Sequence, residues 1–128
     1  MNLQSIIKGL QDFWAGEGCT ILHPYTSEVG AGTLHPATIM SAIDAKLTKF
    51  AYLQPVIRPA DGRYGDNPNR LYQHHQYQVV IKPSGNNLQD AYLSSLKAIG
   101  ISTEKMIGKT QVLVHQGLGG KLHATEWK

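Results

Sequence analysis

Hydrophobic residues near the N-terminus recur at three- and four-residue steps, the spacing of one face of a helix. The pattern predicts an amphipathic helix that ends near Gly16 and Gly18, because glycine commonly follows the last turn of a helix. A short strand is expected over residues 19–23, followed by a glycine-containing loop over 25–33. The apolar stripe of the helix consists of Leu3, Ile6, Ile7, Leu10, Phe13 and Trp14.

Two further helices are predicted downstream. The first begins at Pro36 and runs to about Lys46, with Thr33 or His35 near its start. The second can be capped by an asparagine and stops at Gly100. One side of the first helix carries Ile39, Met40, Ile43 and Leu47; the second has Asn86 or Asn87 at its start and carries Leu88, Tyr92, Leu93, Leu96 and Ile99.

Two central stretches lack a helical period. Residues 50–57 are aromatic and β-branched, and the stretch 76–82 alternates glutamine against Tyr or Val at its start, so together they predict a long antiparallel hairpin. Because side chains alternate between the faces of a strand, a row of amides falls on one face, which suits a polar ligand. One face receives Tyr77, Val79 and Ile81, and the other receives Gln76, Gln78, Val80 and Lys82.

The C-terminal stretch predicts one more hairpin, with strands over 109–115 and 121–127 and a glycine turn over 117–120. The expected fold class is α+β, with helices flanking an antiparallel sheet. That sheet is expected to combine the central hairpin, the strand that begins at Cys19 and the C-terminal hairpin. A chain of 128 residues is predicted to form a single domain over 1–128.

Composition narrows the possible functions only a little. The formal charge of +3 is compatible with a nucleotide or RNA ligand but too small to argue for RNA by itself. The single cysteine, Cys19, excludes an intramolecular disulfide and is interpreted as a small buried hydrophobe. Six histidines show no ligand spacing, so no metal site is predicted from them. No targeting or membrane segment is recognised, and the cytoplasm is the expected location.

The connection between the two central strands, residues 58–70, contains three arginines, two aspartates, two glycines and two prolines. Guanidinium groups match phosphate through their planar fork of donors, so Arg58, Arg63 and Arg70 predict a phosphate-binding loop. The alternative is a solvated turn stabilised by local Asp–Arg pairs. Composition alone leaves both interpretations open.

The stretch from Gln54 to Lys82 resembles motif 2 of the class II aminoacyl-tRNA synthetases, in the form found in the alpha subunit of bacterial glycyl-tRNA synthetase. Upstream residues resemble the beginning of the same subunit, including its motif 1 region, and roughly the first hundred residues share the likeness. The motif 2 residues are Gln54-Pro55, Arg58-Pro59, Asp61-Gly62-Arg63-Tyr64-Gly65, Asn67-Pro68-Asn69-Arg70, Gln76 and Gln78-Val79-Val80-Ile81-Lys82-Pro83; the upstream ones include Gly18-Cys19-Thr20-Ile21, Glu28-Val29-Gly30-Ala31-Gly32-Thr33 and His35-Pro36.

The resemblance implies ATP-dependent activation of glycine with Mg²⁺, followed by transfer to tRNA. Arg58 would act at the α-phosphate as the catalytic residue, and Arg63 and Arg70 would bind the outer phosphates. Gln76 would also contribute to ATP binding. The family implies a homodimer or a synthetase beta subunit as a partner. Residues expected to line the amino-acid pocket are Gln78, Glu28 and Thr33.

The chain departs from the family pattern in two places. The family has two successive arginines where this sequence has Ile57-Arg58. After Ile101 the likeness fades, and the arginine-bearing helix of motif 3 is absent from residues 101–128, which indicates a shortened core. Two alternatives to full activity follow: a non-catalytic nucleotide-binding or scaffold protein, and a minimised synthetase core with weak activity.

Overall fold

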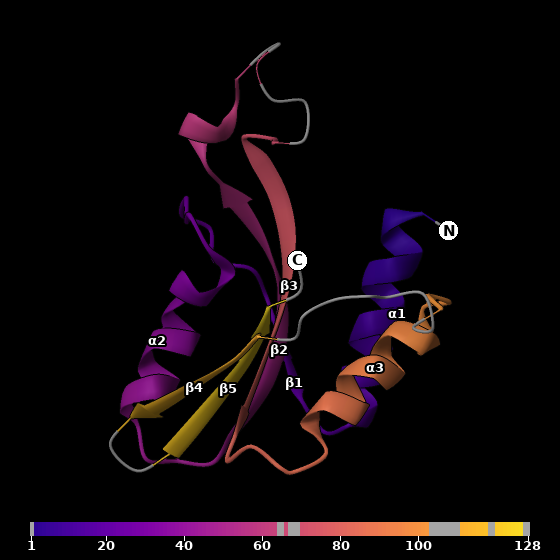
Figure 1. Ribbon diagram of the computed structural model, residues 1–128, viewed down its shortest axis with the longest axis vertical. Coiled ribbons are helices and arrows are strands. Elements are labelled where there is room, and N and C mark those ends of the chain that lie inside the picture. Colours follow the sequence, from indigo (N-terminus) through magenta and orange to yellow (C-terminus); the bar gives the residue numbers. More distant parts are fainter. Residues whose placement is uncertain (1, 64–65, 67–69, 103–110, 118–119, 127–128) are drawn as a thin grey trace.

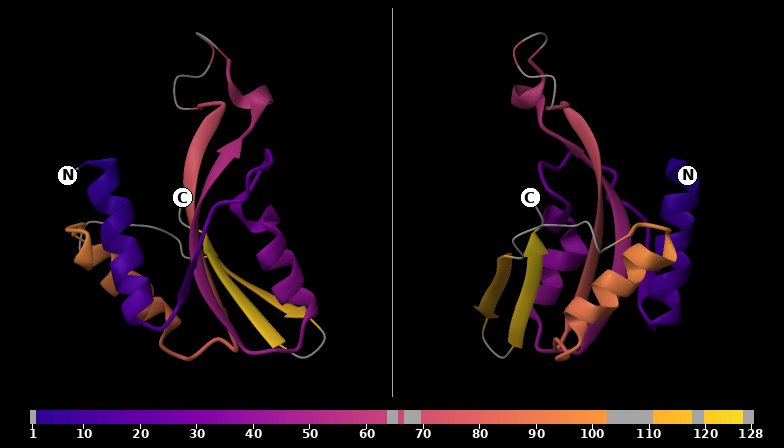
Figure 2. Two further views of the ribbon diagram at one scale, coloured as in Figure 1. Left: turned by 180° about the vertical axis from the view of Figure 1, so that it is seen from behind. Right: turned by 45° about the vertical axis from the view of Figure 1, so that its right-hand side comes forward.

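The computed structural model describes residues 2–63, 66, 70–102, 111–117 and 120–126, with the last two ranges described as backbone (Figure 1). A sheet stands at the centre, with α1 and α3 on one side and α2 on the other (Figures 1 and 2). In chain order, the elements are α1 (Leu3–Gly16), β1 (Thr20–Leu22), the 3-10 helix η1 (Gly32–Leu34), α2 (Pro36–Ile43), β2 (Thr48–Ile57), the 3-10 helix η2 (Pro59–Asp61), β3 (Gln73–Lys82), α3 (Leu88–Ala98), β4 (Gln111–Gly117) and β5 (Gly120–Glu126).

The central hairpin is confirmed. Strands β2 and β3 are antiparallel over their whole length, with Thr48 opposite Lys82 at one end and Ile57 opposite Gln73 at the other. The two faces also carry the predicted residues: Tyr77, Val79 and Ile81 pack beside Trp14, Cys19 and Ala51 under α1 and α3, whereas Val80 packs with Phe50 and Tyr52 on the α2 side.

The prediction of one antiparallel sheet is wrong in two respects, although the α+β class is confirmed. First, β1 pairs parallel with β2, so the three-stranded sheet β1-β2-β3 is mixed. The connection over 23–47 contains α2 and is long enough to return the chain to the end of the sheet from which β1 started. Second, β4 and β5 form the predicted C-terminal hairpin as a separate two-stranded sheet, which contacts β3 without joining its ladder.

The helix boundaries follow local signals. A capping box between Asn2 and Ser5 begins α1, and Gly18, with φ +82°, allows the chain to turn after it. Of the two residues expected near the start of α2, His35 is the cap, since its ring nitrogen accepts a hydrogen bond from Ala37 N–H at 3.0 Å. Helix α2 ends at Ile43, three residues before the predicted end.

Helix α3 begins and ends beside the residues predicted for its two ends. Asn87 is the cap residue of α3, although its side chain makes no capping hydrogen bond, and Gly100 takes φ +82° beyond the last turn.

The predicted burial of Cys19 is confirmed. Cys19 is 6% exposed, and burial raises the pKa of its thiol. A buried, protonated thiol is a packing group rather than a nucleophile.

Tyr77 and Tyr52 give a matched pair of stability predictions. Tyr77→Phe is expected to stabilise the protein by about 1 kcal/mol, because the buried phenol oxygen of Tyr77 has no hydrogen-bond partner among the described residues. Tyr52→Phe is expected to cost about 1–3 kcal/mol, because the Tyr52 hydroxyl bonds both Thr38 and Gly32. Urea denaturation of both variants checks this, and destabilisation by Tyr77→Phe would contradict it.

The same pair predicts a pH dependence. Burial raises the pKa of Tyr77 from 10.0 to about 12. Because the folded pKa lies above the unfolded one, ionisation of Tyr77 leaves the free energy of unfolding unchanged below pH 10 and lowers it as the pH rises toward 12, where the unfolded state loses its proton first. Tyr77→Phe should therefore flatten the fall of the free energy of unfolding across that interval. A slope remains, since burial also raises the pKa values of Tyr52 and Tyr92.

Candidate functional site

A connecting segment lies against the α2 side of the hairpin, toward the end that carries the arginine loop. We call this segment, residues 23–35, the strap. Its Val29 is 8% exposed, and the carbonyl of Val29 accepts a hydrogen bond from Ile57 N–H at 2.9 Å. The strap thereby joins the last residue of β2 by a backbone hydrogen bond.

Two glutamines that face each other across the ladder bind the strap. Gln54 and Gln76 are register partners on β2 and β3. The Gln54 amide accepts from Tyr25 N–H at 2.8 Å and donates to Tyr25 O at 3.2 Å and to Pro55 O at 3.0 Å. Gln76 Oε1 accepts from Gly32 N–H at 2.6 Å. Gln54 and Gln76 therefore satisfy backbone groups of the strap.

Tyr52 completes the attachment at Gly32. Its hydroxyl donates to Gly32 O at 2.8 Å and is 2.5 Å from Thr38 Oγ1, which ties the strap to α2. Burial raises the pKa of Tyr52, and the hydrogen bond with Thr38 offsets part of that increase. A β-carbon on Gly32 would lie 3.0 Å from Gln76 Oε1, so only glycine fits here without displacing the amide.

Arg58 follows directly after β2 and is oriented by the strap. Its Nε donates to Gly30 O at 2.8 Å, and its backbone N–H donates to Tyr72 O at 2.6 Å. The side chain is exposed, and its two terminal nitrogens have no partner among the described residues. The guanidinium group is therefore fixed on its Nε edge, and within the described part of the chain its other edge makes no contact with a protein group.

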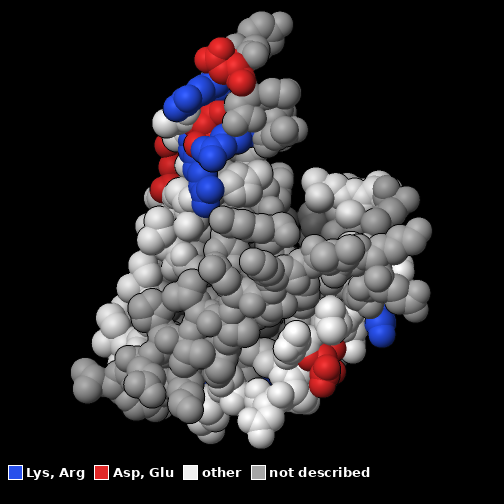
Figure 3. Space-filling model, viewed as in Figure 1, with Lys and Arg blue, Asp and Glu red and all other residues white. Residues whose placement is uncertain are grey.

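The other two arginines lie farther along the connection. Figure 3 shows basic and acidic atoms gathered at this end of the molecule. Arg70 pairs with Asp61 at 3.4 Å, with side-chain exposures of 64% and 26%, and Arg63 is exposed. The Arg70–Asp61 pair is the kind of local contact that the solvated-turn interpretation expects, and an exposed pair of this type contributes little stability.

The remaining predicted residues lie on or beside the strap. Glu28 and Thr33 are exposed strap residues, next to the buried Val29 and Gly32. Gln78 is half-buried, and its Nε2 donates to Val79 O at 3.5 Å. The structure thus brings Arg58, Glu28, Thr33, Gln76 and Gln78 to one region through the strap, while Arg63 and Arg70 lie beyond it in the connection.

The sequence patterns alone assign no role to Gln54, to Tyr52 or to the strap glycines Gly30 and Gly32, whose backbone groups make these hydrogen bonds. Gln54 was recognised only as part of motif 2. One feature of the sequence could have indicated the role of Gln54: it is a glutamine within the aromatic and β-branched stretch that forms β2. In the structure it lies opposite Gln76. A polar side chain buried at such a position must find hydrogen-bond partners.

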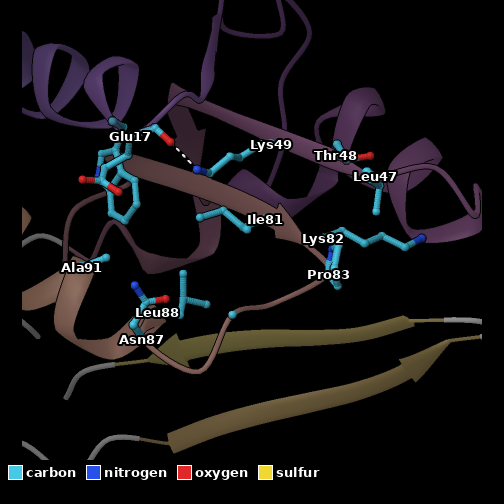
Figure 4. Close-up of a pocket in the computed structure, with 12 residues that line it drawn as sticks. Glu17, Leu47, Thr48, Lys49, Ile81, Lys82, Pro83, Asn87, Leu88 and Ala91 are labelled. Atoms are coloured by element: carbon cyan, nitrogen blue, oxygen red, sulfur yellow. Dashed lines mark hydrogen bonds between the residues drawn. The ribbon is translucent and has the colours of Figure 1, made fainter.

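A pocket of about 420 Å³ lies elsewhere, between the end of α1, the start of α3 and the opposite end of the hairpin (Figure 4). Thr48 and Lys82 line it, and these residues form the end of the ladder farthest from Ile57 and Gln73. The Lys49 ammonium donates to the Glu17 carbonyl at its rim. Because the described lining contains none of the predicted site residues, this pocket is separate from the candidate site.

In the described part of the chain, no group of three or more His, Cys, Asp or Glu residues is arranged to bind a metal ion. None of the helices in that part is sufficiently long and apolar to cross a membrane.

The mixed sheet with flanking helices, and the hairpin that presents an arginine beside a row of amides, define part of a class II synthetase-like α+β core. A family model for the glycyl-tRNA synthetase alpha subunit matches residues 3–107. The chain belongs to this family. The family match supports a ligase of the aminoacyl-tRNA synthetase kind.

Proposed function

We propose that the chain activates glycine with ATP, forming glycyl-adenylate and releasing pyrophosphate. The observation that carries the proposal is the oriented Arg58: the strap fixes one edge of the guanidinium through Gly30 O, the backbone N–H of Arg58 bonds Tyr72 O, and the terminal nitrogens have no partner among the described residues. A preorganised cation next to a polar face stabilises charge that develops on a phosphate during transfer. Family membership supports glycine as the amino acid.

Each site residue has a proposed role. Arg58 binds the α-phosphate and stabilises the charge that builds there when the glycine carboxylate attacks. Arg63 and Arg70 bind the outer phosphates, and Arg70 exchanges its contact with Asp61 for the more highly charged triphosphate. Gln76 contributes to ATP binding from the sheet. Gln78, Glu28 and Thr33 border the glycine pocket, where Glu28 can pair with the amino group.

Mg²⁺ belongs to the proposal as the ion that neutralises triphosphate charge when bound. The described residues provide no cluster of three acidic or imidazole ligands. Magnesium commonly keeps several waters and is bound by one or two carboxylates together with substrate phosphates. Asp61, which pairs with Arg70, and Asp66 are the carboxylates of the same connection as Arg63 that would contact such an ion through its waters or directly.

Partners enter the proposal through the family and through one surface. The family supports tRNA and a synthetase beta subunit as partners, with the cytoplasm as the location. For self-association the structure adds an observation: α2 and the residues after it expose apolar side chains to solvent. The exposed fractions are Ile39 44%, Met40 64%, Ile43 75% and Leu47 82%. We propose that this α2 surface forms the homodimer contact, because large exposed apolar patches mark interaction sites.

The proposed activity is tested by exchange of labelled pyrophosphate into ATP. The chain with ATP, Mg²⁺ and glycine should support exchange, and omission of glycine should abolish it. Alanine in place of glycine is the matched substrate control and should give much weaker exchange. ATP binding without exchange would favour the non-catalytic alternative, and slow glycine-dependent exchange would favour the minimised core. Absence of ATP binding would overturn the proposal.

A further inference from the structure

We propose that Gln54 is a positioning residue of the ATP site: its buried amide holds the strap on the sheet, and the strap in turn orients Arg58. Gln54 lies behind the strap, is 1% exposed and has no route to a ligand. Its effect must therefore pass through the groups that it contacts. The inference rests on the function proposed above and assigns a role to a residue that this function does not otherwise use.

The Gln54 amide is matched to the backbone that it binds. Within the described residues, the oxygen of Gln54 accepts from Tyr25 N–H, and its nitrogen donates to Tyr25 O and to Pro55 O. Both backbone groups of Tyr25 are thereby satisfied by one side chain. A carboxamide can do this because it carries an acceptor and two donors. Removing it would leave polar backbone groups without partners at a partly buried position.

The contacts continue from Tyr25 to the guanidinium. Four residues after Tyr25, the carbonyl of Val29 accepts from Ile57 N–H, and the next carbonyl, that of Gly30, accepts from Arg58 Nε. At its other end the strap is held independently at Gly32, through Gln76 and Tyr52. The section from Tyr25 to Gly30 is therefore held at Tyr25 by Gln54 and at Val29 by Ile57, and Arg58 contacts this section at Gly30.

The test uses Gln54→Met, which keeps the length of the side chain and removes its hydrogen bonds. Calorimetric titration should show ATP affinity lowered about tenfold or more. Hydrogen exchange without ATP should show faster exchange of the backbone amides in 25–30. The matched control is Ser95→Ala, which removes the hydrogen bond from another side chain with 1% exposure, to Tyr92 O in α3, away from the strap. It should leave ATP affinity unchanged.

A second background separates positioning from general destabilisation. Arg58→Lys lacks the Nε–H that binds Gly30, so adding Gln54→Met to it should change ATP affinity by less than about twofold. A full tenfold further loss in that background would mean that Gln54 does not act through Arg58 and would overturn the inference. Should Gln54→Met fail to fold, Gln54→Asn keeps the amide but shortens its reach and should give the same pattern.

The outcomes also separate this inference from the proposed function. If the unaltered chain binds ATP and Gln54→Met binds it equally well, the inference is wrong and the proposed function stands. If strap exchange is unchanged in Gln54→Met, the claim that Gln54 holds the strap is wrong whatever the ATP result. If the unaltered chain does not bind ATP, the proposed function fails and the positioning role fails with it.

Discussion

Arg58→Ala is expected to reduce glycine-dependent pyrophosphate exchange by two to three orders of magnitude. Removing one preorganised donor to a developing oxyanion costs about 2.7–4 kcal/mol in barrier height, roughly 10²–10³ in rate. Among the arginines predicted to bind phosphate, Arg58 is the one whose side chain donates a hydrogen bond to the strap, at 2.8 Å from Gly30 O. The rate constant at saturating ATP and glycine is the measurement that checks the effect.

Two comparisons make the Arg58 result interpretable. Arg58→Lys retains the charge but loses the planar fork and the bond to Gly30, so an intermediate rate is expected. Lys8→Ala removes one positive charge from an exposed position on α1, where Lys8 pairs with Asp12 at 3.2 Å, and should leave exchange unchanged. Equal losses in Arg58→Ala and Lys8→Ala would show that overall charge, rather than the position of Arg58, governs the rate.

Ile43→Asp is expected to convert a homodimer into a monomer. Ile43 ends α2, is 75% exposed and belongs to the proposed α2 surface. A carboxylate in an apolar contact loses its hydration without gaining a partner, which costs several kcal/mol and occurs twice in a symmetric dimer. Sedimentation velocity over a range of protein concentrations is the measurement.

Leu3→Asp provides the matched control for the dimer prediction. Leu3 is also a large apolar residue, 54% exposed, and lies at the start of α1 on the other side of the sheet. It should leave the sedimentation coefficient unchanged. A monomeric unaltered chain, or a dimer that withstands Ile43→Asp, would show that the α2 surface is not the contact between copies.

Much of the candidate site could be predicted from sequence because local patterns carry the information. The alternation in β3 assigned Gln76 and Gln78 to one face, and the structure has them there, with Tyr77 on the other face. The arginine connection was likewise recognisable from its composition alone. The roles of these residues stay predictions, since position on a face does not by itself identify a ligand.

Local patterns could not predict the strap. Its contacts join residues far apart in the chain, such as Tyr25 with Gln54 and Gly32 with Gln76, separated by 29 and 44 positions. The hydrophobic pattern of the strap and that of the strands do not specify which backbone group a glutamine will bind. The parallel pairing of β1 has the same origin, because the direction of a strand depends on where its connection runs rather than on its own residues.

The amino-acid sequence by itself determined the helices, the hairpin and the faces of its strands, since short-range periodicity and turn residues encode them. It also determined membership of the family, through motif 2 and its neighbours. Only the tertiary structure decided that the amides bind the strap, that Gly30 orients Arg58 and that the C-terminal hairpin forms its own sheet. These features depend on long-range hydrogen bonds whose partners are chosen when the segments pack together.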